Sequence, residues 1–304
     1  MAKVRNNFLD YVVYLLARVV VATLYMFPIR ANYLTARLAA GLFWRLASKR
    51  RRQSMEHIRA SFPDWSEDEV QRVAQQSLYG FAYMAMEVLF TPRLITPARW
   101  RRHIELINCA ELIRMLLENE RGIIFVTGHF GNFEIVGYTM ATLGFPSVAV
   151  ARPLDNPYIN DWIMGVREKT GQSILYKKGA TESMDDILER RGSLSFIADQ
   201  DAGRKGAFVD FFGRPASTFK TPALMAMQHN VPIVVGFGRR LGLDCRFEIA
   251  VESIIRPADW ADKSDPMLWI TQEYTRNIEQ IVRRTPEQYL WLHRRWKHQP
   301  KQGS

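Results

Sequence analysis

The chain has 304 residues, of which 47% are hydrophobic, so it is long enough to bury one sizeable core. Its formal net charge of +10 indicates a polyanionic partner, such as a phosphorylated substrate, an anionic lipid or a nucleic acid, unless it reflects only a basic soluble surface. The two cysteines, Cys109 and Cys245, provide no disulfide framework and favour a reducing compartment.

An apolar segment at residues 8–29, FLDYVVYLLARVVVATLYMFPI, has about the ~20 residues that a helix needs to span hydrocarbon. Asp10 and Arg18 interrupt it, and an arginine at the centre of a spanning helix costs ~3 kcal/mol. The basic cluster KRRR follows at residues 49–52 and is suited to an anionic cytoplasmic leaflet. We predict that residues 1–52 form a membrane anchor with a basic flank. The alternative is an ordinary buried helix, and the pattern leaves open whether the helix crosses the bilayer or lies along it.

A helical front end is predicted for residues 53–120. Ser66 and Glu69 have the spacing of a capping box, and they precede apolar residues at helical intervals. These apolar positions, which we expect to lie in the core, are Val70, Val73, Ala74, Leu78 and Phe81.

From residue 122 onward, short apolar runs alternate with amphipathic segments, which is typical of an α/β fold with a mostly parallel sheet flanked by helices. We place residues 53–304, with the helical front end, in one domain. The expected strands are residues 123–126, 147–151, 173–176, 194–198, 233–237 and 246–253. The expected helices are residues 156–169, 181–191, 221–229 and 265–284.

Polar residues follow three of these strands, and ligands gather at the carboxyl ends of strands in such sheets. They are His129, Arg152 and the run Asp199, Gln200 and Asp201. We expect them to converge on one site, although polar residues also commonly cap buried strands.

The stretch TGHFGNFEIVG places Glu134 five residues after His129. Five residues turn a continuous helix so far that the two side chains could not touch, so His129 must lie in the loop before a helix. Gly131 gives that loop backbone freedom, and Asn132 is suited to cap the helix, with Glu134 in its first turn. An ionised carboxylate there would orient and charge the imidazole, which makes a general base that has no nucleophile of its own. The alternative is a capping asparagine beside a structural histidine.

The H-x-x-x-x-E arrangement of His129 and Glu134 resembles the catalytic motif of the glycerolipid and lysophospholipid acyltransferase superfamily. Four further blocks resemble the late acyltransferases of lipid A biosynthesis, particularly the lauroyl branch. They are ARPLDNPYINDW from Ala151, IADQDAG from Ile197, FVDFFGRPA from Phe208 and PEQYLWLHRRWK from Pro286. The resemblance covers nearly the whole chain and implies the αβ sandwich of glycerolipid acyltransferases.

The resemblance implies an enzyme of the inner membrane whose catalytic domain lies on the cytoplasmic face. It would move a fatty acyl chain from acyl carrier protein, or from CoA, to a hydroxyl of a lipid A precursor or a related glycolipid. His129 would deprotonate that hydroxyl, Glu134 would hold and charge the imidazole, and no cofactor is expected. The implied partners are acyl carrier protein, the glycolipid acceptor and anionic membrane lipids, with no nucleic acid.

Other residues are implied in binding substrate. Arg167 stands where the family carries an arginine needed for activity, and Arg152 opens the RPLDNP block, so both suit a phosphate or an oxyanion. Gly131 and Asn132 are also expected at the substrate, as are Asp199, Gln200 and Asp201. We expect no metal, because neither a third carboxylate nor a histidine accompanies Asp199 and Asp201 at ligand spacing.

Several alternatives remain. The acceptor can be another glycolipid, such as a phosphatidylinositol mannoside, although the run ADQDAGRKG in place of the superfamily's phosphate-binding block argues against glycerol-3-phosphate. A non-catalytic, basic membrane-surface protein explains the charge and the anchor, and a water-using thioesterase explains the histidine and glutamate. The tail WLHRRWKHQ fits an amphipathic segment on an anionic membrane, although Trp291 and Trp296 are equally suited to a core.

Overall fold

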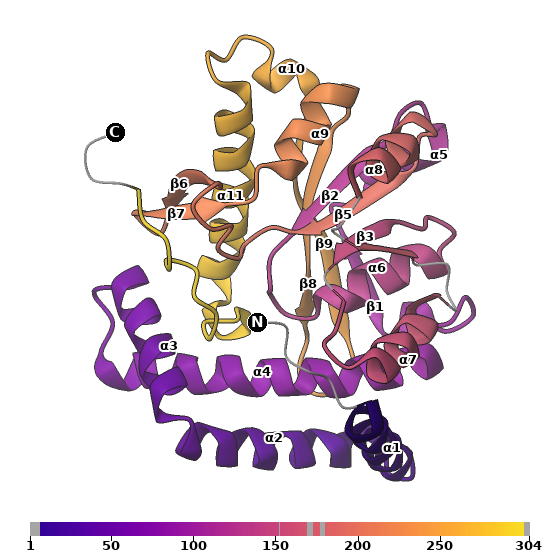
Figure 1. Ribbon diagram of the computed structural model, residues 1–304, viewed down its shortest axis with the longest axis vertical. Helices are drawn as coiled ribbons and strands as arrows, with labels where there is room; N and C mark the ends of the chain where they lie inside the picture. The colour runs from indigo at the N-terminus through magenta and orange to yellow at the C-terminus, as the bar shows by residue number, and fades with distance from the viewer. Residues whose placement is uncertain (1–6, 152, 169–172, 177–179, 301–304) are drawn as a thin grey trace.

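The computed structural model describes residues 7–151, 153–168, 173–176 and 180–300. Its centre is a seven-stranded sheet flanked by helices, with a layer of N-terminal helices along one edge of the molecule (Figure 1). The strands of the sheet, in the order in which they pair, are β1 (Ile104–Ile107), β9 (Phe247–Ile255), β8 (Ile233–Arg240), β2 (Ile123–Thr127), β5 (Ser193–Ile197), β3 (Val148–Ala151) and β4 (Ser173–Tyr176).

The sheet is mostly parallel, as the alternating sequence pattern predicts. Among the described strand pairs of this seven-stranded sheet, only β8–β9 is antiparallel. The central strands β2, β5 and β8 are mostly buried because both of their faces are covered, and β2 and the first half of β8 read as near-continuous apolar runs. All six expected strands are present, with ends that differ by a few residues.

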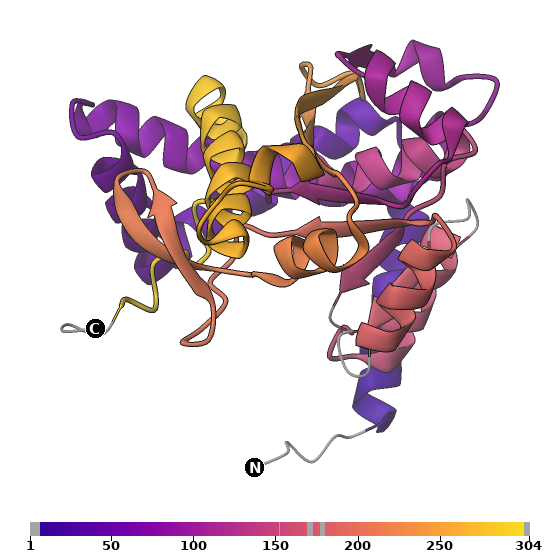
Figure 2. The ribbon, with the colours of Figure 1, turned by 90° about the horizontal axis from the view of Figure 1, so that it is seen from above.

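The helices that follow β1 along the chain are α5 (Ala110–Glu118), α6 (Phe133–Thr142), α7 (Pro157–Glu168), α8 (Ala180–Glu189), α9 (Thr221–His229), α10 (Pro257–Trp260) and α11 (Pro266–Arg284). The four helices predicted here are confirmed. The sequence pattern did not predict α5, the edge strand β1, or a separate hairpin of β6 (Ala207–Phe211) and β7 (Arg214–Thr218). Figures 1 and 2 place this hairpin beside α11 and the C-terminal segment.

The chain before the sheet forms α2 (Ile29–Leu46), α3 (Ser48–Ser61) and α4 (Glu67–Leu94), and the predicted front end of residues 53–120 contains the end of α3, all of α4, and also β1 and α5. The predicted capping box is confirmed, since the Ser66 side chain accepts from the backbone N–H of Glu69, and the Glu69 carboxylate accepts from the Ser66 N–H. The apolar face of α4 is buried as expected except for Phe81, which is 40% exposed. The predicted boundary at residue 52 falls inside α3.

The N-terminal apolar segment forms α1 (Asn7–Leu24) and ends before Pro28, after which α2 begins. Among the described residues, α1 is the one helix whose length and mean hydropathy of 1.5 would allow it to cross a membrane. None of its residues is fully buried, so the alternative of an ordinary buried core helix is wrong.

Candidate active site

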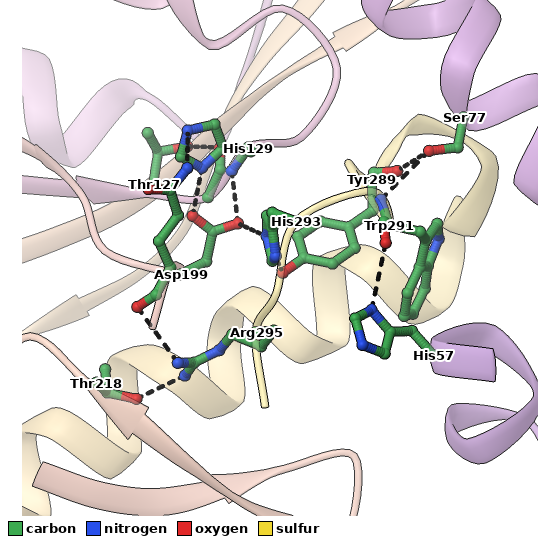
Figure 3. Close-up of polar contacts among 12 residues, drawn as sticks. His57, Ser77, Thr127, His129, Asp199, Thr218, Tyr289, Trp291, His293 and Arg295 are labelled. Carbon is green, nitrogen blue, oxygen red and sulfur yellow. Dashed lines mark hydrogen bonds and ion pairs between the residues drawn. The ribbon is translucent and has the colours of Figure 1, made fainter. Parts of the chain in front are cut away.

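The register of two neighbouring strands brings the first two site residues together. Thr127 and Ile197 are paired at the carboxyl ends of β2 and β5. His129 and Asp199 each lie two residues beyond this pair, and Nδ1 of His129 is 2.6 Å from Oδ1 of Asp199 (Figure 3). The predicted convergence of polar residues at the strand ends is thus observed for these two side chains.

The hydrogen bonds of the imidazole fix its tautomer. Because an ionised carboxylate only accepts, the Nδ1–H of His129 donates to Asp199, and Nε2 keeps its lone pair. The amide Nε2 of Gln200 lies 3.2 Å from this second ring nitrogen. The other oxygen of Asp199 accepts the backbone N–H of His129 at 2.8 Å, so one carboxylate orients both the ring and its loop.

Neighbouring charges raise the pKa of His129 and lower the pKa of Asp199. Burial alone would lower the pKa of His129, but the charge and hydrogen bond of Asp199 and the charge of Glu134 raise it above 6.5. Burial alone would raise the pKa of Asp199, but His129 and then His293 hold it well below its usual range. Asp199 is therefore an ionised carboxylate inside the protein, and His129 is a stronger base than a free imidazole.

The loop between β2 and α6 has the predicted conformation. His129 lies before the helix, the side chain of Asn132 accepts the N–H of Ile135 at 3.0 Å, and Glu134 lies in the first turn. Gly131 has a φ of +55°, and a Cβ there would lie 2.0 Å from the carbonyl oxygen of Gly238. Only glycine fits this position.

The expectation that Gly131 and Asn132 contact substrate stays a prediction, and the contacts that the structure shows for them are with the protein itself. The side chain of Asn132 is fully buried, where it caps α6 and donates to Glu87 at 2.9 Å. Gly131 is enclosed by β8 on one side and by the backbone of Gln288 on the other. Both residues fix the shape of the loop.

A buried ion pair beneath the loop was not predicted. The carboxylate of Glu87, on α4, accepts from the guanidinium of Arg240, on β8, and also from Asn132 and the hydroxyl of Tyr33. Glu87 is 1% exposed, and Arg240 is 7% exposed. The ion pair thereby joins the front end to the cap of α6. The glutamate lies within an amphipathic helix, where no local pattern marks it as buried.

The C-terminal segment holds the other side of the His129 loop. The backbone N–H of Leu290 donates to the carbonyl of His129 at 3.0 Å, and that of Gly131 donates to the carbonyl of Gln288 at 2.8 Å. His293 lies against Asp199, with Nε2 at 3.5 Å from Oδ2, and against the hydroxyl of Tyr289 at 3.1 Å (Figure 3). This segment is the PEQYLWLHRRWK block of the sequence.

The interpretation of this tail as a membrane-surface helix is wrong, and the alternative of a core segment is confirmed. Trp291 is 1% exposed, and its indole N–H donates to the carbonyl of Pro286 at 2.8 Å. Arg295 is fully buried, and its guanidinium donates to the carbonyl of Ser217 at 2.6 Å and to the hydroxyl of Thr218 at 2.5 Å. An arginine with such partners fixes the tail to the β6–β7 hairpin.

Of the remaining predicted residues, Asp201 makes a structural contact, while the side chains of Arg152 and Arg167 are not described. The carboxylate of Asp201 accepts from Nδ1 of His298 at 2.6 Å and so anchors the end of the described chain. Arg152 lies outside the described residues. Arg167 belongs to α7, and its side chain is likewise outside the described part of the structure.

Two cavities share lining residues from the first turn of α6, next to the His129 loop. An apolar cavity of about 120 Å³ lies between α6 and the sheet, and a groove of about 1190 Å³ runs between α1, α4 and α7. Phe133 and Glu134 line both cavities. The Phe133 ring centroid is 5.2 Å from that of His129, so a residue that lines both cavities lies against the imidazole.

The proximity of His293 was not predictable from ligand spacing in the sequence. His129, Asp199 and His293 offer three ligand atoms within 4.8 Å of one another. However, the 2.6 Å contact between His129 and Asp199 is a hydrogen-bond distance, shorter than the separation of two ligands around a metal at ~2.0–2.2 Å from each. The side chains of His129, Asp199 and His293 are arranged as a chain of hydrogen-bonded groups. The absence of a metal stays a prediction.

A mostly parallel sheet with a histidine and a carboxylate at its carboxyl edge, beside apolar cavities, is suited to an enzyme that uses acid–base chemistry on an apolar substrate. The sequence model of one family, described as bacterial lipid A biosynthesis acyltransferase, matches residues 2–298, and the chain belongs to this family. It is therefore an enzyme that transfers an acyl group in lipid A biosynthesis.

Individual relatives agree with this assignment. The lipid A biosynthesis lauroyltransferase of Escherichia coli K12 is 28% identical over 260 residues, which cover 83% of this chain and 81% of the relative. The lipid A biosynthesis palmitoleoyltransferase of the same organism is 26% identical, over 83% and 80% of the two chains. A lipid A biosynthesis acyltransferase of Haemophilus influenzae is 25% identical, over 84% and 80%. The names of the two Escherichia coli relatives specify different acyl chains at similar identity, so the identity does not assign a chain length here.

Proposed function

We propose that this enzyme transfers a fatty acyl chain from acyl carrier protein to a hydroxyl of a lipid A precursor, with His129 as the general base. The observation that carries the proposal is the contact between His129 and Asp199. Because the Nδ1–H of His129 donates to the carboxylate of Asp199, Nε2 is the ring nitrogen that can accept a proton. The imidazole is neither fully enclosed nor solvated, since 15% of its side chain is exposed.

The acceptor hydroxyl supplies the nucleophile in this mechanism. Within the described residues, the ring nitrogens of His129 contact only Asp199 and Gln200, so no serine, threonine or cysteine is placed to form an acyl-enzyme. As Nε2 accepts the hydroxyl proton, the oxygen attacks the thioester carbonyl and forms a tetrahedral intermediate. Its collapse forms the ester, breaks the carbon–sulfur bond and releases the thiolate, which takes the proton back from His129.

Two carboxylates support the base in different ways. Asp199 holds the tautomer and stabilises the imidazolium through a direct hydrogen bond, as the acid of a serine protease triad does. Glu134, on the first turn of α6, raises the pKa of His129 through its charge and lines the cavities on the substrate side. The histidine and glutamate of the sequence motif thus act together with Asp199.

The apolar cavity between α6 and the sheet suits the donor chain. It is lined mainly by apolar side chains, among them Phe125, Met140 and Ile174, and it opens beside Phe133. A fatty chain in this space would bring its thioester to the mouth beside His129. Each buried methylene contributes ~0.8 kcal/mol, so the depth of the cavity would govern the preferred chain length.

We place the enzyme at the cytoplasmic face of the inner membrane. There, acyl carrier protein would reach the enzyme from water, and the acceptor lipid would reach it from the bilayer. The apolar α1 and the exposed basic residues Lys49, Arg50 and Arg52 support this location.

The test uses purified enzyme in detergent with a tetra-acylated lipid A precursor and either acyl carrier protein thioester or acyl-CoA, with products identified by mass spectrometry. The wild type should give the acylated lipid, and His129→Ala should reduce transfer at least about a thousandfold, since it removes the base. Free fatty acid in place of acylated lipid would make the enzyme a thioesterase. Near wild-type transfer by His129→Ala would disprove the mechanism.

A further inference from the structure

The groove between α1, α4 and α7 is lined mainly by apolar and aromatic side chains, and it carries two arginines as well as the carboxylate of Glu134. Arg18, at the centre of α1, donates from Nη1 to the hydroxyl of Tyr14 at 2.8 Å, and its guanidinium lies 5.3 Å from the ring centroid of Trp162. Arg93, in the last turn of α4, lies 3.8 Å from the ring centroid of Tyr25. Both arginines line the groove.

Neither guanidinium forms an ion pair with a carboxylate in the described part of the chain. Among the residues that the structure describes, no carboxylate lies within 4.0 Å of Arg18 or of Arg93, and their contacts are with aromatic rings and a phenol. Aromatic faces attract a cation but leave its hydrogen-bond donors available. The groove therefore attracts an anionic group, and a phosphate matches the paired donors of a guanidinium.

The other face of α1 indicates where a ligand of this groove comes from. Tyr11, Tyr14, Arg18 and Tyr25 lie on the groove side, while a second set of side chains lies on the opposite side, at successive helical turns. This exposed apolar set is Leu9, Val13, Leu16 and Val20. A matching set occurs at every fourth residue of α2, namely Leu34, Leu38, Leu42 and Leu46, which are 57–74% exposed.

The two apolar faces lie at the same edge of the molecule. In Figure 1, α1 is seen end-on and α2 along its length at that edge, so the two helices lie crosswise in one layer. Helices with one apolar and one polar face, flanked by cations, lie in the plane of a membrane interface. This placement also removes the ~3 kcal/mol cost of an arginine at the centre of a spanning helix, because Arg18 would lie at the depth of the lipid headgroups.

We propose that this groove binds the acceptor as a phosphate-bearing lipid, that Arg18 and Arg93 contact its phosphate, and that α1 forms one wall of the site. The groove lies next to the His129 loop, since Phe133 and Glu134, in the first turn of α6, are among the residues that line it. This inference rests on the proposed function for the identity of the acceptor, but it concerns a binding site that can be measured without catalysis.

The experiment measures equilibrium binding of a phosphorylated lipid A precursor, and of its enzymatically dephosphorylated form, to the full-length His129→Ala protein in neutral detergent. Adding Arg18→Gln with Arg93→Gln should weaken binding of the phosphorylated lipid by roughly tenfold or more and leave the dephosphorylated lipid nearly unaffected. Arg18→Lys should retain most of the affinity, because it keeps the charge. The matched control is Arg45→Gln, an exposed arginine on α2 outside the groove.

Equal affinities of the double variant and its parent for the phosphorylated lipid, or an equal loss in Arg45→Gln, would overturn the proposal. In the enzyme that retains His129, the same pair of substitutions should raise KM for the acceptor and leave KM for the acyl donor unchanged. If the wild type transfers no acyl chain at all, the proposed function fails, while the binding measurement still decides whether the groove recognises phosphate.

Discussion

His129 and Asp199 are 70 residues apart in the chain, yet they lie on adjacent strand ends, and the carboxylate contacts both the ring and the backbone N–H of the histidine. This double contact makes Asp199 the direct partner of the base. It also predicts that the two acids near the imidazole are not equivalent.

Asp199→Asn should lower kcat by about 10³ to 10⁴, because the amide no longer holds the required tautomer or stabilises the imidazolium. Glu134→Gln should lower kcat less, since Glu134 acts on His129 through its charge. Steady-state kinetics with purified variants measures both, and circular dichroism checks the fold. Asp185→Asn is the matched control, because Asp185 pairs with His229 at 2.7 Å on α8 and α9, away from the site. A larger loss in Glu134→Gln than in Asp199→Asn would reverse the assignment.

The rise of kcat/KM on the acid side of the pH–rate profile, its acid limb, should reflect the raised pKa of His129. A general base works in its neutral form, so kcat/KM should rise with pH through the pKa of the folded enzyme, which lies above 6.5. Glu134→Gln removes a negative charge that raises this pKa and should move the acid limb to lower pH. A pH–rate profile from pH 5 to 9 measures the midpoint. An unchanged or higher midpoint in the variant would show that Glu134 does not act on His129 through its charge.

Glu87→Gln should destabilise the protein by about 3–5 kcal/mol, because it leaves the buried guanidinium of Arg240 without its counter-charge. It should also reduce activity, since Glu87 holds Asn132 at the cap of α6. Thermal unfolding in detergent measures the first effect. The control is Glu248→Gln, which removes the partner of the part-exposed Arg239 and should cost less than about 1 kcal/mol. Similar losses in the two variants would mean that the buried pair has no special role.

If α1 lies along the membrane, residues before and after it face the same side. A cysteine introduced by Asn7→Cys should react with a membrane-impermeant maleimide in sealed inverted vesicles as completely as one introduced by Lys205→Cys in the α/β domain. The native cysteines, Cys109 and Cys245, are free and buried and should give little background. If the Asn7→Cys variant is protected from the reagent until detergent is added, α1 crosses the bilayer.

Much of the fold could be predicted from the sequence because the central strands are short segments rich in apolar residues and the helices between them carry clear end signals. The register of β2 and β5 could not be predicted, since pairing of distant strands is a tertiary property, and so Asp199 was not identified as the partner of His129. β1 has only four residues at a sheet edge, too few to give a periodic signal. The β6–β7 hairpin turns at Phe212 and Gly213, both with positive φ, and a phenylalanine there is not a usual turn signal.

The candidate site likewise contains residues that the sequence could identify and residues that it could not. His129, Glu134 and the cap at Asn132 form a local pattern within one loop and one helical turn, which sequence spacing can describe. His293 and Arg295 belong to a segment whose aromatic and basic composition resembles that of a membrane-surface helix. Its burial depends on acceptors from β7, which composition does not reveal, and therefore the expected role of the tail was wrong.

The backbone bonds from Gln288 and Leu290 to the His129 loop have a consequence for biosynthesis. A ribosome makes the hydrophobic α1 and α2 first and residues 286–295 almost 250 residues later. The nascent polypeptide can thus settle on a bilayer long before its imidazole is held in place. The backbone contacts that hold His129 would therefore form late in synthesis, after α1 and α2 can have reached the membrane.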